Sequence, residues 1–233
     1  MKTYLAFVIL FLSAEAFSKS VNIKPQSQDL KLTLDSSVEK KVTSSLINRQ
    51  FKVTPTGVIV LDDFYMFYHN TKPGKEPKTS VLKVKYTQET FLSPQFEWKS
   101  TRLIEKSNVT RTSQFNVNNK ELLVYFQEDK KPVKSKKIAY KENILPINAM
   151  PYYLFYQGRN KIGIPTDLMV FSEQNQSVQK IAWVYLGTSF ENKKRIHRFE
   201  IKGGLSQIIH LDMDGRILKI KDLARHYIIS NVL

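Results

Sequence analysis

Residues 209–220 read Ile-His-Leu-Asp-Met-Asp-Gly-Arg-Ile-Leu-Lys-Ile, and they carry the clearest fold signal in the chain. Ile209, Leu211 and Met213 alternate with polar residues before the turn, and Leu218 and Ile220 alternate with Lys219 after it. A period of two is typical of a strand with one buried face. The Asp214-Gly215 dipeptide between the two halves favours a two-residue β-hairpin turn. The stretch therefore predicts two antiparallel strands that reverse direction at Asp214-Gly215.

The same period recurs upstream of this hairpin. Segments that alternate, or that are short runs of β-branched and aromatic residues, span 57–61, 64–68, 82–86, 96–98, 115–117, 122–126, 168–171, 181–185 and 197–201. Polar or glycine-containing turns separate several of these segments. Strands joined by short turns indicate an antiparallel sheet, because parallel neighbours need long crossover connections.

One segment, residues 143–158, breaks this period. Asn148 is an acceptable helix N-cap, Pro151 fits the first turn of a helix, and Gly158 follows the apolar run. The segment predicts one short helix over 148–158. Together the patterns predict a mainly β fold, an antiparallel sheet that is open or partly closed into a half-barrel, with one short helix.

The N-terminus has the layout of a secretory signal peptide. Lys2 supplies a positive start, residues 5–12 form an unbroken apolar run of eight, and Ala14-Glu15-Ala16 places small residues at a cleavage site. Eight residues rise only about 12 Å as a helix, far less than the ~30 Å of a bilayer core. The run is therefore too short to be a membrane anchor.

These features predict how the chain is organised. We expect residues 1–16 to be removed, with cleavage after Ser18 as the alternative. Residues 17–233 are expected to form a single mainly β domain, because no shift in composition divides them. Within that range, the sequence leaves two alternatives for residues 17–45: a flexible N-terminal segment or a first edge strand.

The chain is strongly basic and has no cysteine. Its 233 residues include 36 lysines and arginines against 21 aspartates and glutamates, a formal net charge of +15. Signal cleavage removes Lys2 and Glu15, one charge of each sign, so the mature chain keeps this net charge. The missing cysteine excludes disulfides, thiolate metal sites, a cysteine nucleophile and a lipid anchor on cysteine. An exported chain without disulfides is predicted to be periplasmic or secreted, from a Gram-negative bacterium, and no later segment is apolar enough for a transmembrane span.

Residues 143–222 resemble a known kind of protein. The residues that carry the resemblance are Leu145-Pro146, Gln157-Gly158-Arg159 and the hairpin 211–220. This order is similar to bacterial exported envelope domains of unknown function, whose antiparallel β half-barrel is akin to the lipoprotein-carrier fold. The resemblance implies a concave face that holds a lipid or another amphiphile, with the short helix as a lid. The aromatic residues that it makes candidates for a pocket or lid are Tyr152, Tyr153, Phe155 and Tyr156.

No catalytic, metal or cofactor site is expected. The sequence has no Gly-x-Ser-x-Gly motif for a serine nucleophile, and its four histidines lack the His-Glu-x-x-His spacing of a zinc site. Its eight glycines include no glycine-rich loop that would cradle a phosphate group. The chain is therefore predicted not to be an enzyme.

Two basic clusters are candidate contacts for an anionic surface. The residues are Lys130, Lys131, Lys134, Lys136 and Lys137 in the first cluster, and Lys193, Lys194, Arg195 and Arg198 in the second. Lipid headgroups, lipopolysaccharide phosphates and acidic wall polymers are partners of this chemistry, and such contacts are weakened by salt. The alternative is ordinary solvated loop charge. Nucleic acid is not an expected partner, because the chain is predicted to be exported and has no nucleic-acid motif.

The predicted function is non-enzymatic binding of an amphiphilic or anionic envelope component in the periplasm. The alternative is a structural or protein-interaction module of the cell envelope, which would dock through sheet edges and basic loops. An apolar cavity beneath residues 148–158 would favour ligand binding, whereas a concave face filled by its own side chains would favour docking.

Overall fold

The computed structural model describes residues 25–34, 44–69, 80–118, 120–140, 142–160, 162–173, 176–224 and 227–232. The predicted signal peptide, residues 1–16, lies outside this part of the chain. The elements are β1 (Gln26–Leu34), β2 (Ser44–Thr54), β3 (Gly57–His69), β4 (Ser80–Leu92), β5 (Trp98–Lys106), β6 (Thr110–Asn118), β7 (Glu121–Glu128), β8 (Lys134–Ala139), β9 (Ile144–Pro146), a 3-10 turn (Ile147–Ala149), α1 (Met150–Gln157), β10 (Thr166–Ser172), β11 (Ser177–Glu191), β12 (Lys194–Gly203), β13 (Gln207–Leu211), β14 (Ile217–Asp222) and β15 (Tyr227–Asn231).

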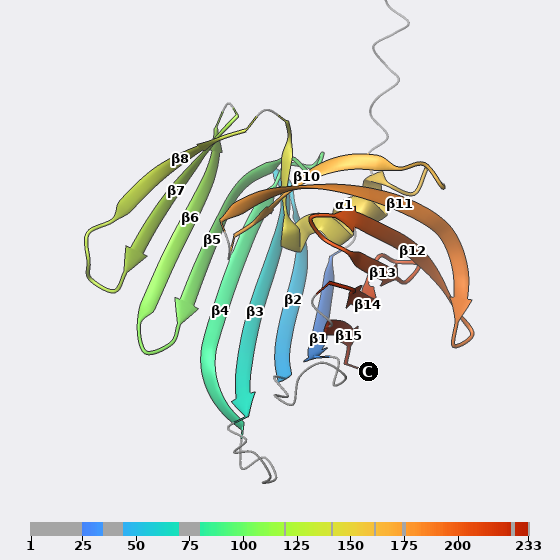
Figure 1. Cartoon of the computed structure of the whole chain (residues 1–233), viewed down its shortest axis with the longest axis horizontal. Helices are drawn as coiled ribbons and strands as arrows, with labels where there is room; N and C mark the ends of the chain where they lie inside the picture. The colour runs from blue at the N-terminus through green and yellow to red at the C-terminus, as the bar shows by residue number, and fades with distance from the viewer. Residues whose placement is uncertain are drawn as a thin grey trace, which may run out of the picture.

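All these strands belong to one 15-stranded sheet, in the order β8-β7-β6-β5-β4-β3-β2-β1-β15-β14-β13-β12-β11-β10-β9. Every neighbouring pair is antiparallel except β9 and β10. Figure 1 shows the sheet curving around α1, which lies on its concave side. The sheet is not closed, because β8 and β9 are its two ends. The predicted mainly β, antiparallel and open fold with one short helix is confirmed.

The described part of the N-terminal segment, predicted as a flexible segment or an edge strand, lies inside the sheet. Residues 26–34 form β1, which pairs with β2 on one side and with β15 on the other. This part of residues 17–45 is therefore neither a flexible tail nor an edge strand. The pairing joins the first and last described strands, so it connects two halves of the sheet that are each built from successive neighbours along the chain.

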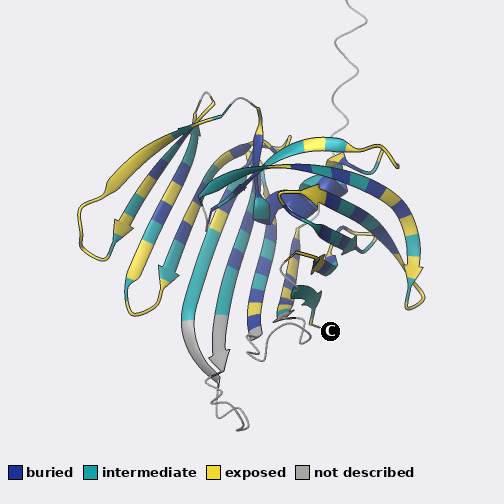
Figure 2. Cartoon of the chain, viewed as in Figure 1, coloured by how far each residue is buried: buried dark blue, intermediate teal, exposed yellow. Residues whose placement is uncertain are grey.

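Side chains on the concave face make the core. Buried and exposed positions alternate along the strands, as Figure 2 shows. Phe51 of β2 stacks on Tyr152 of α1 with ring centroids 4.0 Å apart, and both side chains are fully buried. Phe96 and Tyr156 extend this stack. Such aromatic pairs add about 0.5–1.5 kcal/mol beyond the area that they bury, so the stack fixes the helix to the sheet.

The helix is shorter than predicted and begins differently. It starts at Met150, its N-cap residue is Ala149, and no side chain caps it. Asn148, the predicted cap, is buried in the preceding 3-10 turn, where its side chain contacts the sheet. Pro151 lies in the first turn and Gly158 follows the helix, as predicted.

The C-terminal hairpin is confirmed, but its turn is longer than predicted. Leu211 ends β13 and Ile217 begins β14, so residues 212–216 connect the strands. The Asp212 carboxylate accepts hydrogen bonds from the backbone N–H groups of Asp214 and Arg216, at 2.9 and 2.8 Å. Met213 is consequently exposed within the turn.

The register of β14 also differs from the simple alternation. Ile217 faces Leu211 and Lys219 faces His210, which leaves Leu218 as an extra residue in a β-bulge. The bulge makes Ile217, rather than Leu218, the fully buried residue at the start of the strand. The alternation predicted the strand but not this shift.

Gly215 is required by both its backbone conformation and its packing. Its φ is +85°, and an added Cβ atom would lie 2.6 Å from Cδ1 of Phe155 in α1. We expect Gly215→Ala to lower the free energy of unfolding by about 2 to 4 kcal/mol, from left-handed strain plus overpacking. Urea denaturation measures this loss.

Gly163→Ala is the matched control. Gly163 has a φ of +72°, and nothing lies within 4 Å of its added Cβ atom. It therefore carries the conformational penalty alone, about 1 kcal/mol. Equal losses in the two variants would show that the contact between the hairpin and α1 contributes nothing.

Candidate ligand-binding site

A cavity of about 290 Å³ lies on the concave side of the sheet, next to the N-terminal end of α1. We call it the apolar cavity, because most of its lining is hydrocarbon. Its apolar lining residues are Leu30, Leu32, Ile47, Phe64, Leu103, Ile147, Met150, Pro151, Ile220 and Ile229. Its remaining lining residues are Arg49, Asp62, Tyr86, Gln88, Asn148, Ser172, Gln207 and Tyr227. Both halves of the sheet contribute, so the β1–β15 pairing creates this space.

A buried ion pair forms part of the cavity wall. Arg49 of β2 and Asp62 of β3 face each other directly in the strand register. The Arg49 Nε and Nη2 atoms donate to the two carboxylate oxygens of Asp62, at 2.6 and 2.8 Å. Their side chains are only 9% and 8% exposed. Burial alone lowers the pKa of Arg49, but the charge and hydrogen bonds of Asp62 outweigh it, so its pKa is raised and it stays charged.

A chain of hydrogen bonds extends from this pair into the sheet. Asn148 Nδ2 donates to Asp62 Oδ2 at 3.2 Å, and Asn148 Oδ1 accepts from Thr90 at 3.2 Å. Thr90 is 2.9 Å from the hydroxyl of Thr101, which accepts from Trp98 Nε1 at 2.9 Å. The chain holds the start of α1 at a fixed position over β3, β4 and β5, so the floor of the cavity is preorganised.

A second cavity of about 310 Å³ adjoins the first, and we call it the polar cavity. Its lining residues are Tyr86, Leu103, Glu105, Arg111, Ser113, Phe126, Glu128, Glu173 and Gln176. Tyr86 and Leu103 line both cavities. The two cavities therefore share part of their wall.

Glu173 is a buried carboxyl group at the junction of the two cavities. Glu173 is 2% exposed, and its Oε1 atom accepts a hydrogen bond of 2.9 Å from Gln88 Nε2. Gln88 and Ser172, the residue before Glu173, line the apolar cavity. Burial, with a smaller contribution from the charge of Asp62, raises the pKa of Glu173 to about 8. The group is therefore mostly protonated at neutral pH.

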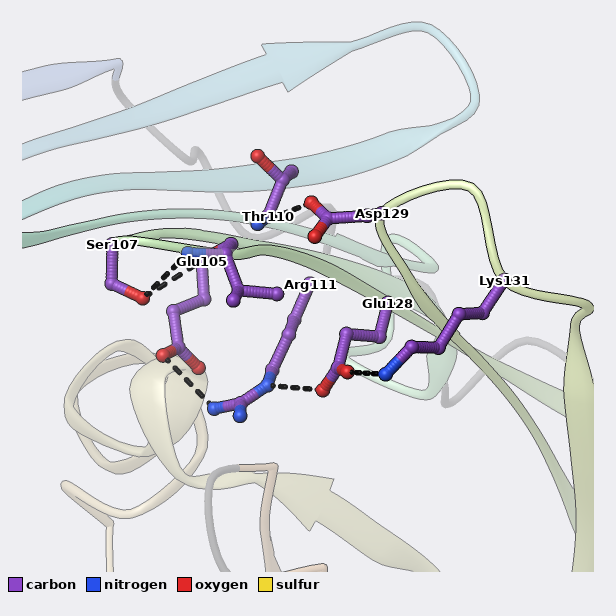
Figure 3. A network of polar contacts seen from close by, with 8 residues as sticks. Glu105, Ser107, Thr110, Arg111, Glu128, Asp129 and Lys131 are labelled. Carbon is purple, nitrogen blue, oxygen red and sulfur yellow. Dashed lines mark hydrogen bonds and ion pairs between the residues drawn. The ribbon is translucent and has the colours of Figure 1, made fainter.

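Charged side chains form a network beside the polar cavity (Figure 3). Arg111 Nε lies 3.1 Å from Glu128 Oε2, and Arg111 Nη1 lies 3.4 Å from Glu105 Oε1. Lys131 also pairs with Glu128. The charges of Arg111 and Lys131 are thus already matched by two carboxylates.

The aromatic residues predicted for a pocket or lid have two different places. Tyr152 and Phe155 are buried in the core, where Tyr152 stacks on Phe51. Tyr153 and Tyr156 are half-buried, and Tyr153 lines a third cavity of about 430 Å³ together with Tyr140. Met150 and Pro151, which directly precede the predicted residues, line the apolar cavity.

The two predicted basic clusters lie far apart along the sheet. Lys130, Lys131, Lys134, Lys136 and Lys137 are exposed on the β7–β8 connection and on β8, the end strand. Lys193, Lys194 and Arg195 are exposed at the β11–β12 turn, and Arg198 is half-buried in β12. The β8 edge and the β11–β12 turn are on opposite sides of the view in Figure 1. They do not form one continuous surface.

The candidate site residues that the sequence analysis missed are Arg49, Asp62 and Glu173. Arg49 shares the inward face of β2 with Ile47 and Phe51, and Asp62 shares the inward face of β3 with Val60. Arg49 and Asp62 could have been predicted, because each is a charged residue at a strand position where the alternation places an inward-facing side chain. Glu173 follows the buried Phe171 at the end of β10, where alternation gives no such signal.

Among the described residues, no helix is long and apolar enough to cross a membrane. The residues that the structure describes include no group of three or more histidine, aspartate and glutamate side chains placed to hold a metal ion.

Comparisons with known proteins identify a fold but no family. No known protein family matches the sequence, and no curated protein matches it. A solved structure from Brucella abortus, a β-barrel-like protein of a domain of unknown function, DUF1849, superposes with a TM-score of 0.64 at 10% sequence identity. The match covers 91% of this chain and 96% of that chain. The chain thus shares a β-barrel-like fold with a protein whose own domain has no assigned function.

Proposed function

We propose that this protein binds an amphiphilic component of the bacterial envelope in the apolar cavity, without catalysing a reaction. The lining of the apolar cavity carries the proposal. It is hydrocarbon on most sides, and the Arg49–Asp62 ion pair forms part of one wall. A ligand with an apolar chain and a polar end matches both parts of this lining. The predicted signal peptide and the basic, cysteine-free composition support a periplasmic or secreted location.

The size of the cavity suits a single acyl or alkyl chain. At about 290 Å³ it is near the lower end of the range for small-molecule sites, which is roughly 300–1,000 Å³. Each buried methylene group contributes about 0.8 kcal/mol, so a chain of about eight groups supplies roughly 6 kcal/mol before the cost of association.

A pair of leucine variants tests this proposal. Leu32 on β1 lines the apolar cavity, whereas Leu46 on the neighbouring β2 points to the opposite face and is 38% exposed. We expect the neutral dye N-phenyl-1-naphthylamine to bind the native protein and Leu46→Trp alike. Leu32→Trp fills the cavity and should weaken dye binding about tenfold or more. Fluorescence titration measures both, and unchanged binding to a folded Leu32→Trp variant would contradict the proposal.

A second candidate function is docking on an anionic envelope component through β8. Lys134, Lys136 and Lys137 are exposed on this edge strand, and Lys137 pairs only loosely with Glu121, at 3.4 Å. Charge on an edge strand also discourages pairing with a second strand, so a salt-sensitive electrostatic contact suits it better.

Charge reversal tests this docking function. The double variant Lys136→Glu, Lys137→Glu should lose most of its co-sedimentation with phosphatidylglycerol vesicles, and salt should weaken the native interaction. The double variant Lys31→Glu, Lys52→Glu, at exposed lysines of β1 and β2, makes the same change in net charge and is the control. Association that stays constant across a salt series would rule out the electrostatic contact.

A further inference from the structure

We propose that the polar cavity holds a cationic headgroup, an organic ammonium ion whose charge takes the place of the proton on Glu173. This inference rests on the proposed function, since it assigns the polar end of the amphiphile whose apolar chain lies in the apolar cavity. The shared lining residues Tyr86 and Leu103 place the two ends side by side.

The lining of the polar cavity differs in charge from the rest of the protein. The whole chain has a formal net charge of +15, yet Glu105, Glu128 and Glu173 all line this one space, with Arg111 as its cation. Tyr86 and Phe126 add aromatic rings to the wall. Carboxylates together with aromatic faces are the groups that recognise ammonium ions in proteins.

Glu173 is the carboxyl group in this lining without a cation beside it. In the part of the chain that the structure describes, Arg111 pairs with Glu105 and Glu128, and Lys131 pairs with Glu128. Glu173 has only the amide of Gln88 as a side-chain partner, although it is 2% exposed. A buried carboxylate without a counter-charge is costly, so the group keeps its proton until a cation arrives.

The exchange balances in charge and protons. An ammonium ion enters the cavity, the Glu173 O–H bond breaks, the proton passes to solvent, and the carboxylate pairs with the ammonium ion. The groups that face this site are Asp62 on β3, Tyr86 on β4, Glu105 on β5, Arg111 on β6 and Glu128 on β7. Arg49 pairs with Asp62, and Arg111 and Lys131 pair with Glu105 and Glu128. Because these charges balance, the Glu173 carboxyl group is what favours a cationic headgroup over an anionic one.

Three ligands with the same ten-carbon chain distinguish the contribution of the headgroup to binding from that of the chain: decylamine, 1-decanol and decanoate. At pH 7 and moderate salt, we expect the native protein to bind decylamine about tenfold more tightly than 1-decanol, and decanoate most weakly. Calorimetry in buffers of different ionisation enthalpy should show close to one proton released per decylamine bound, and none for 1-decanol.

Glu173→Gln decides whether that preference comes from this site. The variant should bind 1-decanol as the native protein does, while its preference for decylamine and the proton release disappear. Glu97→Gln, which neutralises an exposed carboxylate on the β4–β5 connection, should leave both intact. Equal binding of decylamine and 1-decanol by the native protein, or a preference that survives in Glu173→Gln, would overturn the headgroup assignment. If 1-decanol itself does not bind, the proposed function fails as well.

Discussion

Replacing Asp62 with alanine is expected to lower the free energy of unfolding by about 3 to 5 kcal/mol. The variant leaves the guanidinium of Arg49 buried without a counter-charge and removes the acceptor of the Asn148 amide. Because Asn148 holds the start of α1, the loss should also loosen the floor of the apolar cavity. Urea denaturation followed by tryptophan fluorescence measures the change as a shift in midpoint.

Two further variants make this result specific. Asp63 is the next residue of β3, and its partly exposed side chain lies 3.7 Å from Lys85. Asp63→Ala should cost less than about 1 kcal/mol, because exposed ion pairs contribute little. The double variant Arg49→Met, Asp62→Leu removes both charges and should recover most of the stability lost in Asp62→Ala. A loss in Asp62→Ala no larger than that in Asp63→Ala would contradict the buried ion pair.

Glu173→Gln is expected to stabilise the protein at alkaline pH by about 3 to 5 kcal/mol and to change little at pH 4. Burial raises the pKa of Glu173 in the folded state from 4.5 to about 8. Between these values the unfolded chain has released a proton that the folded protein keeps, so the native protein loses stability as the pH rises from about 4.5 to about 8. Glutamine has no titratable carboxyl group, so the stability of Glu173→Gln does not decline in this way as the pH rises.

Thermal unfolding of the native protein and Glu173→Gln at half-unit pH steps measures the difference between them. That difference should grow with pH and become constant above about pH 8. Glu97→Gln, at an exposed site, should show no comparable trend. A difference between the native protein and Glu173→Gln that is independent of pH would show that Glu173 is not held in its neutral form. The proton-linked headgroup site would then lose its basis.

The sequence predicted the local elements well, because strand periodicity and turn residues act over short distances. The alternation around Ile209 and Leu211 predicted β13, and Gly215 predicted the reversal that follows it. The five-residue connection was missed because it depends on the Asp212 side chain bonding to two backbone N–H groups. The bulge at Leu218 was also missed, because the alternation of Leu218 and Ile220 gives no sign of an extra residue in the strand.

The candidate site was predictable only in its general chemistry. Asn148 was assigned as a helix cap, but its amide bonds to Asp62, which is 86 residues away in the sequence. Tyr152 was a candidate for a pocket or lid, and its ring stacks on Phe51 in the core. These contacts, like the pairing of β1 with β15, join residues that are far apart in the sequence. No local pattern in the sequence specifies that pairing.

The most direct test of ligand binding in the apolar cavity is native mass spectrometry of the protein purified from its own host in detergent-free buffer. We expect a fraction of the native protein to carry a non-covalent adduct with the mass of a single-chain amphiphile. Leu46→Trp should keep this adduct, and Leu32→Trp, which fills the apolar cavity, should lose it. The bare chain mass in the native protein, or an adduct that Leu32→Trp retains, would contradict ligand binding in the apolar cavity.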